Sequence, residues 1–194
     1  ILDRAFTGFT ALPAPIVAAI TNDPYDKGDA DYSVTELLNP VRQTWLKRRH
    51  EAEIEEDASE RIWSLLGQAV HSILDRAQVS NSLQEERIVV PVEANGKTFK
   101  VSGKADLFHN GTLTDYKVTS AWTRVYGSRM ADWEEQLNLY AHLFRSLGFE
   151  VSHLEIVCIY RDWSATKAKS DKGYPQAQVE VIKALFMVIL LQDQ

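Results

Sequence analysis

The sequence predicts one α/β domain with a mixed central β-sheet flanked by helices. The 194 residues include 45% hydrophobic and 25% charged side chains, which is the ordinary balance of a folded globular domain. Apolar residues recur at helical spacing over residues 62–74 and 133–144, whereas residues 87–118 carry short β-rich runs separated by turn dipeptides. The order of helices, antiparallel meander, helix and further strands is typical of such a domain.

The N-terminal part is predicted to be helical and broken by loops. A short helix is expected near residues 16–20, and the Asn-, Asp-, Pro- and Gly-rich residues 22–29 favour a loop. Ser33 and Glu36 form a capping-box pattern, so a helix should begin there, restart at Pro40 and reach His50. We interpret residues 1–32 as an extension packed on a single domain of residues 33–194.

The middle of the chain predicts a meander of three or four antiparallel strands. Two Asn-Gly dipeptides, at residues 95–96 and 110–111, are strong hairpin signals. The expected strands are 87–92, 98–101, 105–108 and 112–118.

The C-terminal third predicts a helix and two more strands. Residues 132–147 form an amphipathic pattern that ends before Gly148. Residues 153–160 and 178–182 are expected to be strands, and the apolar residues 184–191 a buried strand or helix. That run is less than half of the roughly 20 residues of a spanning helix, so no membrane segment is predicted and a cytoplasmic location is expected.

Charge and cysteine content exclude some kinds of site. The formal net charge of −6 argues against coating of nucleic acid or anionic membrane through bulk charge. The single cysteine, Cys158, cannot form an internal disulfide, a four-thiolate zinc site or an iron–sulfur cluster.

A group of polar residues around the second hairpin predicts a metal site. Side chains alternate along a strand, so Asp115 and Lys117 should share one face and Tyr116 the other. The turn at residues 110–111 places Asp106 roughly opposite Asp115, and His71 lies on the preceding helix. Carboxylate oxygens suit Mg²⁺ or Mn²⁺, and a bound metal would acidify water beside Lys117. Such a site suits phosphodiester hydrolysis.

Four short motifs, in order, resemble those of the PD-(D/E)XK nuclease superfamily. They are Gly67 and His71 separated by three residues, Gly103-Lys104-Ala105-Asp106, Asp115-Tyr116-Lys117, and Gln136 and Tyr140 separated by three residues. The set is similar to the branch of bacterial recombination exonucleases and their phage relatives, and it spans residues 33–160. Its fold is a restriction-endonuclease-like mixed sheet flanked by helices.

The resemblance implies a role for each matching residue. His71, Asp106 and Asp115 would be metal ligands together with the backbone carbonyl of Tyr116, and Lys117 would be the catalytic lysine. Gln136 and Tyr140, four apart on one helical face, would line the active site. Some relatives place a further acidic ligand where this chain has Glu85 and Glu86, although a solvated turn explains these two residues equally well.

The implied activity is that of a Mg²⁺- or Mn²⁺-dependent DNA exonuclease in phage or bacterial recombination or repair. The lone cysteine points to the relatives without an iron–sulfur cluster. Two alternatives stay open, a catalytically silent DNA-binding module of the same fold and a structure-specific endonuclease. An annealing protein or helicase is a possible partner, and an oligomer is possible.

Basic and aromatic residues outside the motifs are candidates for DNA contact. Arg124 and Arg129 follow the catalytic strand, and a second group lies on the helix after Pro40, where it could equally offset the helix dipole. Trp122 could stack on a base, whereas Trp45, Trp63 and Trp133 are expected in the core. The second group contains Arg42, Lys47, Arg48 and Arg49, and a third group in an expected loop contains Lys167, Lys169 and Lys172.

Overall fold

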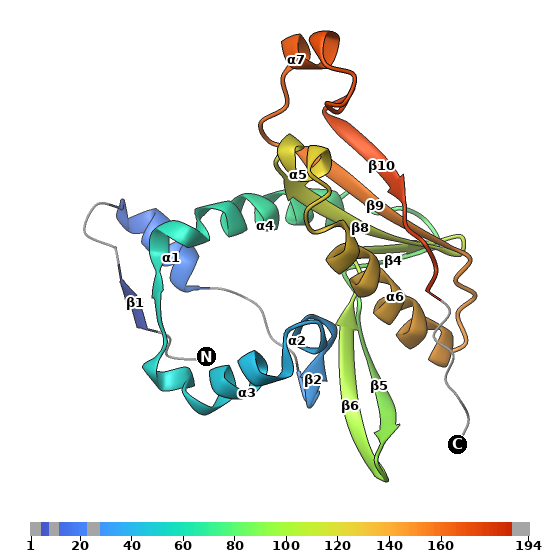
Figure 1. Ribbon diagram of the computed structural model, residues 1–194. Coiled ribbons are helices and arrows are strands. Elements are labelled where there is room, and N and C mark those ends of the chain that lie inside the picture. Colours follow the sequence, from blue (N-terminus) through green and yellow to red (C-terminus); the bar gives the residue numbers. More distant parts are fainter. Residues whose placement is uncertain (1–4, 8–11, 23–27, 188–194) are drawn as a thin grey trace.

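The computed structural model describes residues 5–7, 12–22 and 28–187, and its elements are coloured and labelled in Figure 1. The helices are α1 (Ala14–Thr21), α2 (Val34–Leu37), α3 (Val41–Arg49), α4 (Ile62–Asp75), α5 (Ala121–Val125), α6 (Met130–Ser146) and α7 (Ala165–Ser170). The strands are β1 (Ala5–Thr7), β2 (Tyr32–Ser33), β3 (Glu55–Asp57), β4 (Ser82–Gln84), β5 (Arg87–Ala94), β6 (Lys97–Lys104), β7 (Leu107–His109), β8 (Thr112–Thr119), β9 (His153–Tyr160) and β10 (Val179–Lys183).

The strands of the core form two sheets. The larger has five strands in the order β10-β9-β8-β7-β4; β8 and β9 are parallel and the other neighbours antiparallel. The smaller has the order β2-β6-β5, with β2 parallel to β6. Helix α6 packs against β5, β8 and β9, and α4 packs against β8. The predicted α/β fold with a mixed sheet flanked by helices is therefore confirmed.

The expected continuous meander is wrong, because it divides into two hairpins that belong to different sheets. Both Asn-Gly turns form as predicted, with positive φ at Asn95, Gly96, Asn110 and Gly111. However, β7 pairs with β4 on its free side, and β6 pairs with β2. The chain passes between the sheets just before β7, so Asp106 lies in a connection rather than inside the expected strand 105–108.

Helix α6 packs against strands of both sheets. Its apolar stripe contains Trp133, Leu137, Tyr140 and Phe144, all buried as predicted. Gly103 of β6 lies directly beneath it, because a Cβ there would come within 2.9 Å of both Leu143 Cδ1 and Tyr140 Cδ1. Glycine therefore allows the small sheet to approach the helix that carries the predicted Gln136 and Tyr140 motif.

The remaining helical predictions are confirmed in position. The capping box of Ser33 and Glu36 forms, and α3 restarts after Pro40 and ends before His50. The expected domain boundary at residue 33 falls within β2. Within the described part of the chain, no helix is both long and apolar enough to span a membrane.

Three predictions about individual segments are wrong. The lysines expected in a loop belong partly to a helix, since Lys167 and Lys169 lie in α7. Trp45 and Trp63 are exposed rather than in the core. Residues 184–187 form neither a strand nor a helix; the rest of the run to 191, and residues 23–27 of the expected loop, lie outside the described residues.

Candidate metal centre

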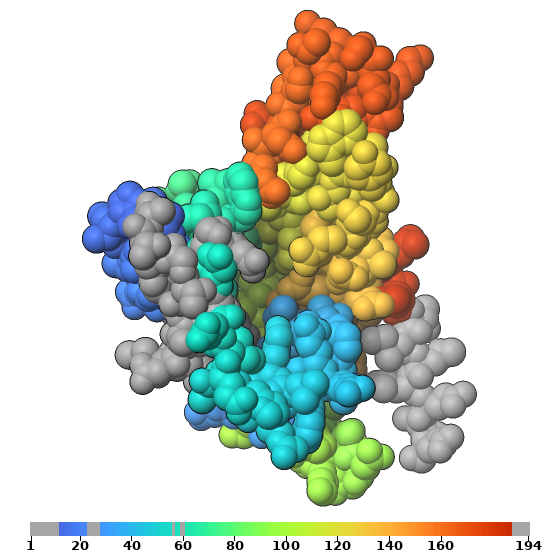
Figure 2. All heavy atoms as spheres, turned by 60° about the vertical axis from the view of Figure 1, so that its left-hand side comes forward, coloured from blue at the N-terminus to red at the C-terminus, as the bar shows by residue number. Residues whose placement is uncertain are grey.

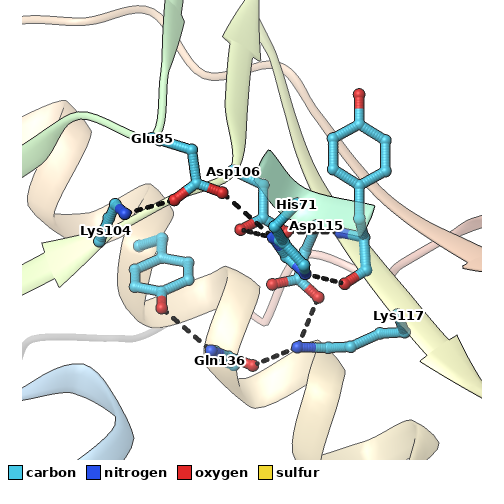
Figure 3. Close-up of polar contacts among 9 residues, drawn as sticks. His71, Glu85, Lys104, Asp106, Asp115, Lys117 and Gln136 are labelled. Atoms are coloured by element: carbon cyan, nitrogen blue, oxygen red, sulfur yellow. Dashed lines mark hydrogen bonds and ion pairs between the residues drawn. The ribbon is translucent and has the colours of Figure 1, made fainter. Parts of the chain in front are cut away.

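Three side chains from three separate segments form a compact group. His71 extends from α4, Glu85 from the connection between β4 and β5, and Asp106 from the connection between β6 and β7. His71 Nδ1 lies 3.1 Å from Glu85 Oε1 and 3.3 Å from Asp106 Oδ1. One potential ligand atom of each residue lies within 4.8 Å of those of the other two (Figure 3).

The backbone fixes the two carboxylates of this group. Glu85 has a left-handed φ of 51°, and its N–H donates to the carbonyl of Asp106 at 3.1 Å. Asp106 Oδ2 accepts a 2.6 Å hydrogen bond from the N–H of Tyr116, which holds it against β8. The carbonyl of Tyr116 in turn lies 3.1 Å from His71 Nε2. The two carboxylates therefore face Nδ1 of His71, and the Tyr116 carbonyl faces Nε2 of the same ring.

A second chain of contacts runs from β8 to α6. Asp115 and Lys117 lie on the same face, as alternation along the strand predicts, and Lys117 Nζ is 2.7 Å from Asp115 Oδ2. Lys117 also donates to Gln136 Oε1 at 3.0 Å, and Gln136 Nε2 donates to the Tyr140 hydroxyl at 3.0 Å. Figure 3 shows this line of contacts beside the His71 group. The Lys117 ammonium is therefore held by Asp115 on β8 and by Gln136 on α6.

The charged groups of the site shift one another's pKa values. Hydrogen bonds to Asp106 and then Glu85 raise the pKa of His71 to about 10, despite partial burial. The bond from His71 is the main cause of the lowered pKa of Glu85, which also pairs with Lys104. Burial raises the pKa of Asp115 to about 6, since its side chain is only 5% exposed, and Lys117 partly offsets this. In the metal-free protein, the His71 imidazolium balances the carboxylates.

The donor set fits a divalent cation. A neutral imidazole, two carboxylates and a backbone carbonyl are ligands found around Mn²⁺ and Mg²⁺. Negative groups at this distance repel one another unless a positive charge lies between them. Asp115 adjoins the group, because the next residue, Tyr116, donates its N–H to Asp106 and places its carbonyl beside His71. The three residues that lie closest together include Glu85, which the sequence had left undecided, in place of the predicted Asp115.

A cavity of about 130 Å³ opens beside the group. Glu85 and Asp106 form part of its wall, and Tyr140 another part. It also presents two cations, Arg87 and Lys104. Lys104 belongs to the second of the four motifs, and its ion pair with Glu85 joins two segments whose approach the sequence does not indicate.

The predicted DNA-contact residues are not part of this group. Arg124 lies on α5 and pairs with Glu180 at 3.3 Å, so its charge is partly balanced. Arg129 is exposed just before α6, and Arg42 and Lys47 are exposed on α3.

The proposed stacking role of Trp122 is not supported by its surroundings. Tyr126 stacks on its ring at a centroid distance of 5.8 Å, and Tyr174 meets it edge-on at 5.6 Å. Lys167 Nζ lies 4.3 Å from the ring centroid. The aromatic surface is therefore occupied by neighbours within the protein.

Comparison with known proteins supports the architecture. No protein-family model and no curated protein matches the chain. Among solved structures, the crystal structure of SSO0001 is similar, with a TM-score of 0.62 and 17% sequence identity over 88% of this chain and 75% of that chain. A likeness at this identity shows a shared α/β fold and nothing about activity.

Proposed function

We propose that the protein is a metal-dependent deoxyribonuclease that hydrolyses phosphodiester bonds. The observation that carries this proposal is the convergence of His71, Glu85 and Asp106 beside the Asp115–Lys117 pair. A structural ion pair would not need a second carboxylate and an imidazole from other segments at the same point. The four motifs that resemble those of PD-(D/E)XK nucleases, in the same order, imply the same activity.

His71, Glu85 and Asp106 would hold Mg²⁺ or Mn²⁺ together with the Tyr116 carbonyl, and Asp115 would face the ion from β8. When bound, such an ion lowers the pKa of a coordinated water and neutralises charge that develops on a phosphate oxygen.

Lys117 supplies the positive charge on the protein side of the site. Asp115 and Gln136 hold its ammonium, and Tyr140 holds Gln136, so Lys117 Nζ has a fixed position. A pre-positioned cation can orient the attacking water and stabilise the additional negative charge of the transition state. Arg87 and Lys104 border the adjoining cavity, which suits a phosphate group of the bound strand.

Within this activity, we favour a cluster-free exonuclease of phage or bacterial recombination or repair. The sequence offers one cysteine, which lies buried in β9, so no iron–sulfur cluster is part of the proposal. An annealing protein or a helicase remains the proposed kind of partner.

Hydrolysis of linear DNA in Mn²⁺ or Mg²⁺ tests the proposal. We expect the wild-type protein to release nucleotides from linear DNA and to leave covalently closed circles intact. Cutting of closed circles would support a structure-specific endonuclease instead. DNA binding without turnover in either metal would support a catalytically silent binding module and contradict the proposal.

A further inference from the structure

Trp63 is a large apolar side chain that the fold leaves in solvent. Its residue is 60% exposed, and it shares α4 with two other exposed hydrophobic residues, Leu66 and Ile73. The structure describes α4 throughout, and none of its residues is fully buried. Several exposed large apolar side chains on one helix are a feature of surfaces that bind a ligand.

The position of Trp63 relates it to the metal centre. Residues 63, 67 and 71 follow one another at intervals of four, so Trp63, Gly67 and His71 lie on successive turns along one side of α4. Eight residues correspond to about 12 Å along a helix axis. Gly67 has no side chain, and no heavy atom of the described residues outside its own stretch of α4 lies within 4 Å of the place that a Cβ would take. The surface between Trp63 and His71 is therefore open.

Arg161 contacts the indole of Trp63. Its guanidinium lies over the Trp63 ring, 4.3 Å from the centroid. The N–H of Arg161 donates to the carbonyl of Thr119 at 3.0 Å, and Thr119 is two residues beyond Lys117 on β8. The Trp63–Arg161 pair therefore connects α4 with the end of the strand that carries the proposed catalytic lysine.

The molecular surface is hollowed in this region. Figure 2 shows a hollow between the teal to green surface, which includes α4, and the yellow surface of α5 and α6. His71 and Lys117 come from α4 and β8, which pack against each other.

We propose that Trp63 and Arg161 form a stacking site for an unpaired base of the DNA strand that is held at the metal centre. This inference rests on the proposed nuclease function and adds its substrate form, a single-stranded segment. An aromatic face binds any base by stacking, and an adjacent guanidinium suits the phosphates that link the bases. Duplex DNA could not stack on Trp63 in this way, because each base face in a duplex is covered by the neighbouring base pair.

A protein partner is the other occupant that such a surface could take. The arginine over the ring and the position of the metal-ligand cluster along the same side of α4 favour nucleic acid, since neither is required for an apolar protein contact. Trp45 provides a matched control, because it is 54% exposed and lies 5.0 Å from the Arg49 guanidinium, yet α3 contributes no residue to the metal centre.

Fluorescence anisotropy with a labelled oligothymidine in Mn²⁺ tests the site. All proteins carry Lys117→Ala, so that bound DNA is not cut and the measurement does not depend on turnover. We expect Trp63→Ala to weaken binding about tenfold or more, which corresponds to the loss of one stacked base, and Trp63→Phe to restore most of the affinity. Trp45→Ala should bind like the parent protein.

Three results would overturn the inference. They are unchanged binding by Trp63→Ala, equal weakening by Trp63→Ala and Trp45→Ala, and equal loss of affinity for an oligothymidine and a blunt duplex. A change in self-association with unchanged DNA binding would assign the surface to a protein partner. Failure of the wild-type protein to hydrolyse DNA would contradict the proposed function separately, because the stacking measurement needs no hydrolysis.

Discussion

The N–H of Tyr116 donates a 2.6 Å hydrogen bond to Asp106 Oδ2, which ties the connection between the two sheets to the central strand β8. The other oxygen of Asp106 faces His71 Nδ1 at 3.3 Å. One oxygen of this carboxylate therefore binds the backbone of β8, and the other is a candidate metal ligand. Its separate oxygens allow the two roles to be tested apart.

Replacement of Asp106 should separate these roles. Asp106→Asn retains an oxygen that can accept from Tyr116 N–H but loses the negative charge, whereas Asp106→Ala loses both. We expect both variants to bind Mn²⁺ at least tenfold more weakly in calorimetric titrations, as is typical when a ligand is lost. Both variants should lower the free energy of unfolding of the metal-free protein, because the charge that faces His71 is lost. Asp106→Ala should lower it by about 1–3 kcal/mol more, because the partly buried N–H of Tyr116 also loses its acceptor. Wild-type Mn²⁺ affinity in Asp106→Asn would contradict this assignment.

Removal of the Lys117 ammonium should impair turnover rather than metal binding. We expect Lys117→Met to reduce kcat on linear DNA by about 10²–10³, the cost of removing one group that stabilises transition-state charge. Gln136→Ala leaves the Asp115 contact in place and should reduce kcat by a smaller factor. Calorimetry with Mn²⁺ provides the control. A Lys117→Met protein that keeps wild-type kcat would exclude the lysine from the reaction.

The stability of the metal-free protein should depend on the charge of His71. Its pKa is raised from 6.5 to about 10 in the folded state, chiefly by Asp106 and Glu85. The stabilisation is therefore fully present below about pH 6.5 and is lost as the pH rises through about 10. Urea unfolding in EDTA checks this. The stability difference between wild type and His71→Gln should shrink over that range, and a constant difference would show that His71 is not charged in the folded protein.

Gly103 should be intolerant of even a methyl group. Gly103→Ala places a Cβ within 2.9 Å of Leu143 and Tyr140, so α6 or its side chains must shift. We expect a loss of about 1–3 kcal/mol in the free energy of unfolding, as is usual for overpacking. Gly67→Ala is the matched control, because its Cβ would meet no atom within 4 Å among the residues that the structure describes, and alanine favours a helix. Equal stability of the two variants would show that the approach of α6 to β6 is not tight.

Local signals in the sequence predicted most elements and the proximity of several candidate site residues. The Asn-Gly dipeptides set the hairpin registers, so the approach of Asp106 to β8 and the shared face of Asp115 and Lys117 could be predicted. The division of the hairpins between two sheets could not, because pairing with β2 and β4 depends on contacts distant in the chain. These short strands carry too few residues to show a period.

Two features of the site also required the fold. Glu85 joins His71 and Asp106 through a left-handed backbone conformation, which is uncommon for glutamate and leaves no mark in the sequence. Trp63 follows the apolar periodicity of α4, and such a tryptophan is ordinarily buried. Its exposure depends on which elements cover the helix, and periodicity does not report this.

The dependence of DNA hydrolysis on Mn²⁺ concentration tests the central claim most directly. The rate of nucleotide release from linear DNA should be absent in EDTA and should saturate over the Mn²⁺ range in which calorimetry shows the metal site to fill. Asp106→Asn should shift both curves to higher Mn²⁺ concentration together. Hydrolysis that persists in EDTA, or an Asp106→Asn protein as active as wild type at every Mn²⁺ concentration, would contradict the account.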